Sequence, residues 1–298
     1  MTIIQHPSAK LTTPESAIRD FLSELRSANK SPRTLTTYRC ELEAFRSYFP
    51  YDPSEITVET VRGYYDTFSQ LAPATRAKKQ AAVSSFLGWC FRNDLIESDP
   101  SQKIMKTKVD APMPRGVKPE DVEKVLKKIP KERARDRLLF GLIYSTGLRA
   151  SEALGIHVED VDLSLDDEHI LIHGKGGHTR RVLLQDRKLL KRLKAYLNET
   201  GYEHGPLFRA LYNGSGDELC YQAAYELWNR YCKRAGVSIK LHQLRHTHAT
   251  QLVNQGVNLE IVRRRLGHKN MQTTLRYAEL SDKVADDEIR KWSRRNRQ

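Results

Sequence analysis

The sequence lacks the motifs that would tie its chemistry to disulfides, metals or nucleotides. Its four cysteines form no C-x-x-C pair and no Cys/His finger spacing, so neither a disulfide framework nor a zinc site is indicated. No G-x-x-x-x-G-K-[ST] segment occurs, and GKGGHT (174–179) places its lysine between glycines rather than at a helix start. HQLRH (242–246) lacks the glutamate of a zinc protease motif, and no G-x-S-x-G or carboxylate-rich nuclease cluster is present. We therefore expect no metal and no cofactor.

Long apolar runs are also missing. No window approaches the ~18 apolar residues of a membrane-spanning helix, and the first ten residues, MTIIQHPSAK, do not resemble a secretory signal. With 39% hydrophobic and 29% charged residues, the composition is that of a globular, soluble protein. We expect a cytoplasmic protein with no membrane partner.

The charge that is present is unevenly distributed. The chain has 50 Lys+Arg against 37 Asp+Glu, a net charge of +13, which indicates a polyanionic partner. Residues 1–105 hold 13 basic against 12 acidic residues, whereas residues 106–298 hold 37 against 25. Nearly all of the excess positive charge therefore lies in the C-terminal two-thirds.

Length and hydrophobic periodicity predict two domains. Apolar stripes at helical spacing in residues 14–105 predict a helical domain over residues 1–105, followed by a proline-containing linker at 106–118. Residues 119–298 are mixed, with a predicted hairpin of strands 169–173 and 180–184 around a glycine-rich turn. Further helices are expected at 132–146, 187–199, 221–235, 242–255, 259–266 and 281–291. The predicted fold is mainly α, with a small β-sheet in the C-terminal domain.

Six residues of the C-terminal region stand in short, motif-like settings. They are Arg149 in TGLRASEAL, Lys175 in the hairpin, His242 and Arg245 in LHQLRHTHAT, His268 in LGH and Tyr277 in TTLRYAEL. Cleaving a phosphodiester without metal requires cationic donors for the non-bridging oxygens, a proton donor for the leaving oxygen and a nucleophile. This set contains all three, and guanidinium groups bind phosphate oxygens in a bidentate fork.

The order Arg, Lys, His-x-x-Arg, His, Tyr resembles the tyrosine recombinases, the phage-integrase-type and Xer-type site-specific recombinases. The flanking residues TGLR-x-SE, H-x-LRH and LGH, and the nine-residue step from His268 to Tyr277, belong to the same pattern. The resemblance covers the whole C-terminal region. The helical N-terminal segment is similar to the core-binding, SAM-like domain of that family, which implies a two-domain, C-shaped clamp around DNA.

The resemblance also implies a role for each matching residue. Tyr277 would attack the scissile phosphate to give a 3′-phosphotyrosyl link, Arg149 and Arg245 would hold the non-bridging oxygens, and Lys175 would protonate the 5′ oxygen. His242 and His268 would assist by managing protons and by hydrogen bonding to phosphate. Glu152 resembles an acidic residue that orients the first arginine. His246 is interpreted as a structural residue beside the site.

Other basic and polar residues are candidates for DNA contact. They are Thr34, Arg39, Arg76, Lys78, Lys79, Arg180, Arg181 and Arg264. Arg263, Arg264 and Arg265 point in different directions on a helix, so not all three can face DNA.

The resemblance implies an enzyme that exchanges strands through a Holliday junction, as a homotetramer on two duplexes, in integration, excision or dimer resolution. The C-terminal helix, with Ile289 and Trp292 on one face, would dock on a neighbouring protomer. The expected location is the prokaryotic cytoplasm, in association with the nucleoid or a mobile element. A type IB topoisomerase is the alternative with the same chemistry, and a non-catalytic DNA-binding protein is a further one.

Overall fold

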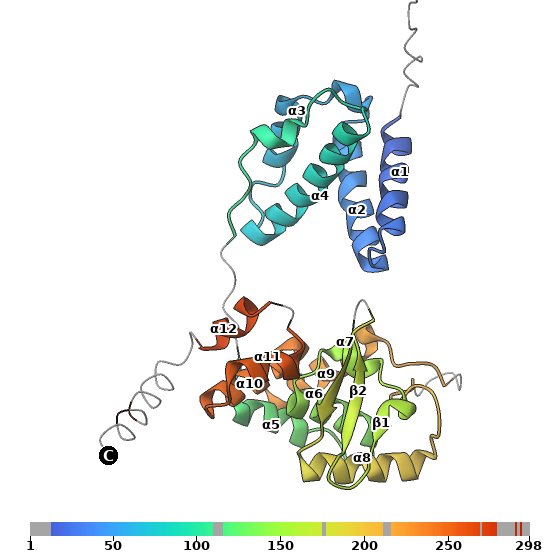
Figure 1. The fold of residues 1–298 in the computed structure, drawn as a ribbon, viewed down its shortest axis with the longest axis vertical. Coiled ribbons are helices and arrows are strands. Elements are labelled where there is room, and N and C mark those ends of the chain that lie inside the picture. Colours follow the sequence, from blue (N-terminus) through green and yellow to red (C-terminus); the bar gives the residue numbers. More distant parts are fainter. Residues whose placement is uncertain are drawn as a thin grey trace, which may run out of the picture. The chain divides into compact units, whose positions relative to one another are not determined.

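The chain divides into two compact units, Met1–Ala111 and Pro112–Gln298. The structure is a computed structural model and describes residues 13–109, 116–174, 177–210, 216–268 and 270–278, with the single positions 290 and 293. Helices predominate in both units (Figure 1). Across the described part of the chain, no helix is long and apolar enough to cross a membrane.

The N-terminal unit is helical. Its elements are α1 (Pro14–Ser27), α2 (Pro32–Tyr48), a 3-10 turn η1 (Pro53–Glu55), α3 (Val58–Asp66), α4 (Pro73–Arg92) and η2 (Pro100–Lys103). Proline occupies the start of α1, α2 and α4, where its missing N–H would have no helical partner. The side chains of Thr13 and Ser31 cap α1 and α2 by accepting backbone N–H groups.

An aromatic cluster fills the core of this unit. The ring of Phe21 lies 5.7 Å from each of the rings of Tyr38, Phe86 and Trp89. These residues come from α1, α2 and α4, so one cluster joins three helices, and the apolar stripes expected in residues 14–105 are confirmed.

The C-terminal unit packs helices against one face of a small sheet. Its elements are α5 (Pro119–Lys127), α6 (Ala134–Thr146), α7 (Ala150–Leu154), η3 (Val158–Asp160), β1 (Val161–Asp162), β2 (His169–His173), β3 (Thr179–Leu183), α8 (Arg187–Thr200), α9 (Tyr221–Ala235), α10 (Leu241–Asn254), α11 (Leu259–Leu266) and α12 (Gln272–Ala278). The three strands pair antiparallel in the order β1-β2-β3. The mainly helical fold with a small sheet in this unit is confirmed.

The local predictions differ from the structure mainly at element ends. α9 and α11 have the expected limits, and β3 begins at Thr179, one residue earlier than expected. The short helices α5, α7 and α12 are additional to the expected elements. The helix expected at 281–291 lies almost entirely outside the described residues.

The core helix α6 ends at Gly147, a position where neighbouring side chains leave no room for a Cβ atom. Gly147 has φ +70°, the left-handed conformation that favours glycine at a helix C-terminus. A Cβ there would lie 2.6 Å from His248 Cδ2 and 2.7 Å from Leu266 Cδ2. Gly147 therefore lets α10 and α11 approach the end of α6 closely, just before Arg149.

Candidate active site

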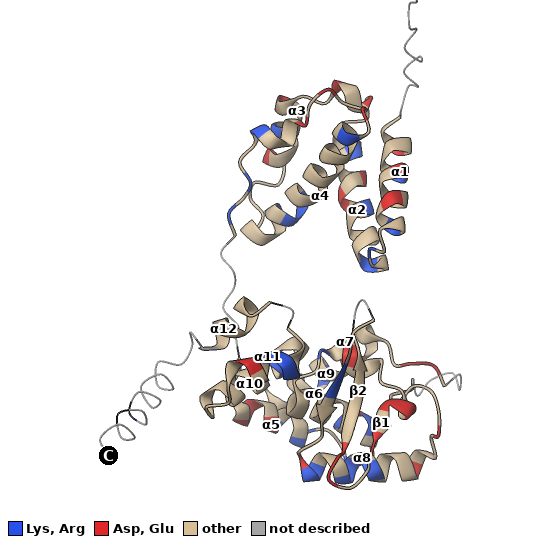
Figure 2. Cartoon of the chain, in the orientation of Figure 1, with Lys and Arg blue, Asp and Glu red and all other residues tan. Residues whose placement is uncertain are grey.

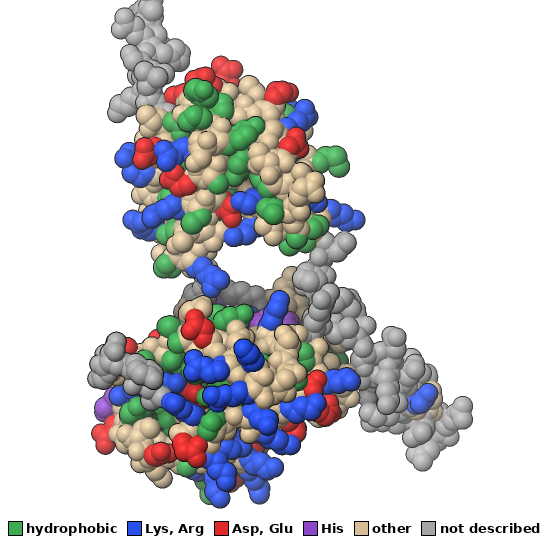
Figure 3. All heavy atoms as spheres, turned by 180° about the vertical axis from the view of Figure 1, so that it is seen from behind, with side chains coloured by type: hydrophobic (Ala, Val, Ile, Leu, Met, Phe, Trp, Pro, Cys, Tyr) green, Lys and Arg blue, Asp and Glu red, His purple; other side chains and the backbone are tan. Residues whose placement is uncertain are grey.

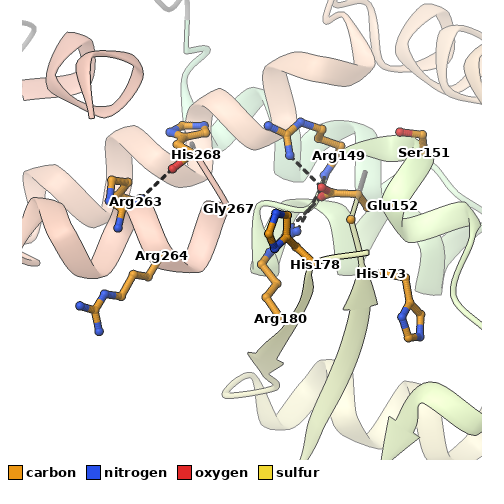
Figure 4. Close-up of a pocket in the computed structure, with 11 residues that line it drawn as sticks. Arg149, Ser151, Glu152, His173, His178, Arg180, Arg263, Arg264, Gly267 and His268 are labelled. Carbon is orange, nitrogen blue, oxygen red and sulfur yellow. Dashed lines mark hydrogen bonds and ion pairs between the residues drawn. The ribbon is translucent and has the colours of Figure 1, made fainter. Parts of the chain in front are cut away.

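A cavity of about 950 Å³ opens in the C-terminal unit, between the end of the β2–β3 hairpin, α7 and α11 (Figure 4). The residues that line it are Arg149, Ser151, Glu152, His173, Gly174, His178, Arg180, Arg263, Arg264, Gly267 and His268. Figure 2 shows both basic and acidic positions among the helices and strands of this unit. The cavity thus collects residues that are up to 119 positions apart, from Arg149 to His268.

Glu152 lies among three arginines at the edge of this cavity. Its carboxylate accepts a hydrogen bond from Arg149 Nη1 at 2.7 Å and two from Arg180, at 2.8 and 3.1 Å. Arg245 Nη1 lies 3.9 Å from Oε2 of the same carboxylate. Burial opposes ionisation, but the hydrogen bonds from Arg180 and from the backbone N–H of Arg149 outweigh it and hold the pKa of Glu152 at about 2. The cluster therefore carries three positive charges and one negative charge.

Arg245 is almost completely buried at the end of two helices. Its Nη1 donates to the carbonyl of Gly147 and its Nη2 to the carbonyl of Leu266, each at 2.9 Å. These carbonyls belong to the C-terminal ends of α6 and α11, which favour a cation. Burial, and then the charge of Arg149, lower the pKa of Arg245 to about 10, so it stays protonated at neutral pH.

Tyr277 lies on α12 and packs against histidines from two other segments. Its hydroxyl is 2.7 Å from Nδ1 of His246, and its ring lies parallel to that of His268 with centroids 6.3 Å apart. The side chain is only 1% exposed and belongs to an apolar cluster with Val262 and Leu266. Among the described residues, Tyr277 is next to the cavity-lining His268 but does not itself line the cavity.

The three histidines around Tyr277 differ in exposure, but the pKa of each is lowered. His242 keeps one part of its side chain exposed, and burial of the rest of its ring, followed by the charges of Arg245 and Arg149, lowers its pKa. His268 is buried, its Nδ1 lies 2.9 Å from Thr274 Oγ1, and its pKa falls to about 3, mainly through burial. His246 has a pKa of about 4 for the same main reason. These rings are neutral at neutral pH.

The structure brings most of the predicted catalytic residues together. Arg149, Arg245, His268 and Tyr277 lie in one region with Glu152, and the ring of His242 is 4.6 Å from that of His246. Lys175 lies outside the described residues, although Gly174 and His178 of its hairpin line the cavity. Within the described ranges, no group of three or more His, Cys, Asp or Glu side chains is placed to hold a metal ion.

The predicted DNA-contact residues fall into two sets. Arg180 points into the cavity and is paired with Glu152, Arg181 pairs with Asp167, and Arg264 is largely exposed beside the cavity. In the N-terminal unit, Lys78 and Lys79 both contact Glu41. Thr34 Oγ1 forms a hydrogen bond with Oγ of Ser31, the residue that caps α2. Arg39 is exposed on α2, and Arg76 is half-buried on α4.

Sequence reasoning missed the contact between His246 and Tyr277. The spacing held a signal, because His246 follows His242 by four residues and therefore lies on the same face of α10. The partnership of Arg180 with Glu152, 28 residues away, had no such signal.

Comparison with known proteins identifies the family. Residues 115–283 match the model of the phage integrase family, and residues 18–94 match its N-terminal SAM-like domain. The chain belongs to the phage integrase family of tyrosine recombinases. Tyrosine recombinase XerC of Roseiflexus castenholzii is 30% identical over 272 residues, which cover 85% of each chain. Tyrosine recombinase XerA of Thermococcus kodakarensis is 29% identical over 281 residues, which cover 94% of this chain and 95% of that protein.

Solved recombinase structures share the fold. XerH bound to palindromic difH substrate in a post-cleavage complex has a TM-score of 0.72 at 24% identity, covering 94% of this chain and 85% of XerH. A lambda integrase tetramer bound to a Holliday junction has a TM-score of 0.71 at 17% identity, covering 90% and 83%. Family membership makes this recombinase an enzyme of DNA strand cleavage and rejoining. These relatives give the topoisomerase alternative no support.

Proposed function

We propose that this recombinase cleaves and rejoins duplex DNA at a specific core site through a 3′-phosphotyrosyl intermediate on Tyr277. The observation that carries the proposal is the cluster of Arg149, Arg180 and Arg245 around the single carboxylate of Glu152. Its excess of two positive charges suits an anion, and guanidinium groups match the geometry of phosphate oxygens. The nucleophile and two histidines lie beside it.

In the proposed reaction, Oη of Tyr277 forms a bond to phosphorus while the bond from phosphorus to the 5′ oxygen breaks. Arg149 and Arg245 stabilise the charge that develops on the non-bridging oxygens. Lys175 donates a proton to the leaving 5′ oxygen, and His242 and His268 assist through hydrogen bonds. Glu152 holds the side chain of Arg149 in place. The phosphotyrosyl bond retains the energy of the diester, so rejoining requires no nucleotide.

The two domains expected from the sequence have different roles in this proposal. Residues 1–105 act as the core-binding domain, 106–118 as the linker and 119–298 as the catalytic domain. Thr34, Arg39, Arg76, Lys78 and Lys79 contact DNA from the first domain, and Arg180, Arg181 and Arg264 from the second. Seen from behind, Lys and Arg side chains cover much of the C-terminal unit, while those of the N-terminal unit are interspersed with acidic ones (Figure 3).

We further propose a homotetramer on two duplexes that exchanges strands through a Holliday junction. The lambda integrase tetramer on a Holliday junction supports this assembly through its shared fold. The C-terminal helix expected at 281–291 would dock on a neighbouring protomer. The enzyme would act in the cytoplasm, on nucleoid or mobile-element DNA.

The decisive experiment compares the wild type with Tyr277→Phe. Wild-type protein is incubated with a library of randomised duplexes, and covalently attached DNA is recovered under denaturing conditions and sequenced to define the core site. We expect Tyr277→Phe to bind this site with unchanged affinity and to form no adduct, because only the hydroxyl is removed. An adduct with the Phe variant would contradict the assignment.

A second assay separates recombination from supercoil relaxation. A plasmid with two copies of the selected site should yield recombinant products with the wild type. Relaxation of a plasmid that lacks the site, without recombinants from the two-site plasmid, would favour a topoisomerase.

A further inference from the structure

His246 contacts the atom that the proposed function assigns as the nucleophile. We propose that His246 is a further catalytic residue, whose Nδ1 accepts the hydrogen bond of the Tyr277 hydroxyl and takes up its proton as Oη attacks the phosphate. The 2.7 Å separation of these two atoms carries the inference. It rests on the proposed role of Tyr277 as the nucleophile.

The packing of α10 fixes the position of the His246 ring. The neighbouring Arg245 is anchored to the carbonyls of Gly147 and Leu266, which holds this turn of α10 against the ends of α6 and α11. The rings of His242 and His246 meet edge to face, with centroids 4.6 Å apart and an interplanar angle of 82°. The His246 imidazole is therefore braced on one side and faces Tyr277 on the other.

Burial and the neighbouring charges make His246 a neutral acceptor before DNA binds. Partial burial, and then the neighbouring His242 and Arg245, hold the pKa of His246 at about 4. A neutral imidazole has one acceptor nitrogen and one N–H, so a hydroxyl that donates to Nδ1 places the ring proton on Nε2. The negative charge of a bound phosphodiester would offset the nearby arginines and raise the proton affinity of His246 when the reaction needs it.

The second histidine beside Tyr277, His268, has a different hydrogen-bond partner. Nδ1 of His268 lies 2.9 Å from Thr274 Oγ1, and its ring is parallel to that of Tyr277 rather than directed edge-on at the hydroxyl. In the proposed step, the proton moves from Tyr277 Oη to His246 Nδ1 as the bond to phosphorus forms. The 5′ oxygen takes its proton from a separate acid, for which Lys175 is proposed. Rejoining returns the proton from His246 to Oη.

Three substitutions at one position test this role. Asparagine places an amide oxygen close to the position of Nδ1, whereas glutamine places it close to that of Nε2, so His246→Asn and His246→Gln form a matched pair. The readout is the single-turnover rate of adduct formation on a nicked duplex carrying the selected core site, with DNA affinity and circular dichroism measured in parallel.

We expect His246→Ala and His246→Gln to cleave on the order of 10²-fold more slowly than the wild type, with unchanged DNA affinity. His246→Asn should fall between them and the wild type, because it accepts the hydrogen bond but cannot take up the proton. An Ala variant as fast as the wild type would overturn the proposal. A His246→Asn variant as fast as the wild type would also overturn it, since the amide oxygen accepts the hydrogen bond but cannot take up the proton.

A modified substrate separates the nucleophile from the leaving group. A 5′-bridging phosphorothiolate has a leaving sulfur that needs no acid, so it should restore cleavage by Lys175→Ala but not by His246→Ala. Restoration in the His246 variant would contradict proton transfer from Tyr277. If the wild type forms no adduct, or Tyr277→Phe still does, the proposed function fails. If both behave as expected and His246→Ala matches the wild type, only the role of His246 fails.

Discussion

In each of the two units, one shielded carboxylate contacts several cationic side chains, but the two charge clusters are not equivalent. Glu41 of the N-terminal unit lies 2.8 Å from Lys79 Nζ and 3.3 Å from Lys78 Nζ. Glu152 of the C-terminal unit is as shielded as Glu41, and three arginines surround it. Lysine ammonium groups are hydrated point charges, whereas a guanidinium paired on one side still presents N–H donors on another.

This difference shows why the net charge of a unit is a poor guide to its chemistry. A site is suited to phosphate when several cations surround a smaller number of carboxylates. Shielding of those cations from water adds to the effect. One of the three arginines is buried, with two helix ends as its partners. The histidines are also unevenly distributed between the two units. Nine of the ten lie in Pro112–Gln298, and the other is His6.

The largest effect expected is a loss of stability at mildly acidic pH that is confined to the C-terminal unit. The buried His248 and His268 have a pKa of about 3, so they bind protons less readily in the folded than in the unfolded chain, where the pKa is near 6.5. Their contribution to the free energy of unfolding is complete above pH 6.5 and is lost as the pH falls toward 3. At pH 4.5 each should have lost about 3 kcal/mol.

Hydrogen exchange of the full chain, followed by mass spectrometry at pH 7 and pH 4.5, checks this expectation. Peptides of Pro112–Gln298 should lose protection after correction for intrinsic rates. Peptides of 13–109 should keep it, because this range contains no histidine. An equal loss of protection in both units would refute the histidine explanation.

Replacing the carboxylates of Glu152 and Glu41 by amides should lower the free energy of unfolding of the two units by different amounts. Glu152→Gln leaves the buried Arg245 and its neighbours without a counter-charge, so we expect a loss of about 3 kcal/mol of unfolding free energy and a slower cleavage step. Glu41→Gln is the matched control, and its solvated lysine partners should limit the loss to about 1 kcal/mol or less. Urea unfolding of both full-length variants measures the difference, and equal losses would show that the clusters are equivalent.

The smallest effect concerns two glycines with the same backbone conformation. Gly267 and Gly236 end α11 and α9 with φ near +67°, so alanine at either should cost roughly 1 kcal/mol. A Cβ on Gly267 would also lie 2.9 Å from the guanidinium carbon of Arg180, whereas nothing lies within 4 Å at Gly236. We expect similar thermal stabilities but slower adduct formation only in Gly267→Ala, because Arg180 must move. Slower cleavage in both variants would mean that Arg180 is not the cause.

Local sequence patterns predicted the helices well because their signals lie within a few residues. Ser31 caps α2 directly before Pro32, and Gly147 ends α6, so the residues that delimit these helices lie at the helices' own ends. The short helix α7 carried no comparable apolar repeat, and its first turn is held by the Glu152 side chain, which accepts the backbone N–H of Arg149. Its presence depends on a polar contact that periodicity does not report.

The sequence by itself determined the chemical inventory of this recombinase: the Arg, Lys, His and Tyr motifs, the charge excess beyond residue 105 and the helices that carry them. Helical spacing alone placed His242, Arg245 and His246 along one helix. Only the tertiary structure decided that Arg245 lies between the ends of α6 and α11 and that His246 meets Tyr277, 31 residues away. The physical reason is range, since backbone periodicity fixes neighbours within a few turns, whereas contacts between distant segments depend on how the helices pack.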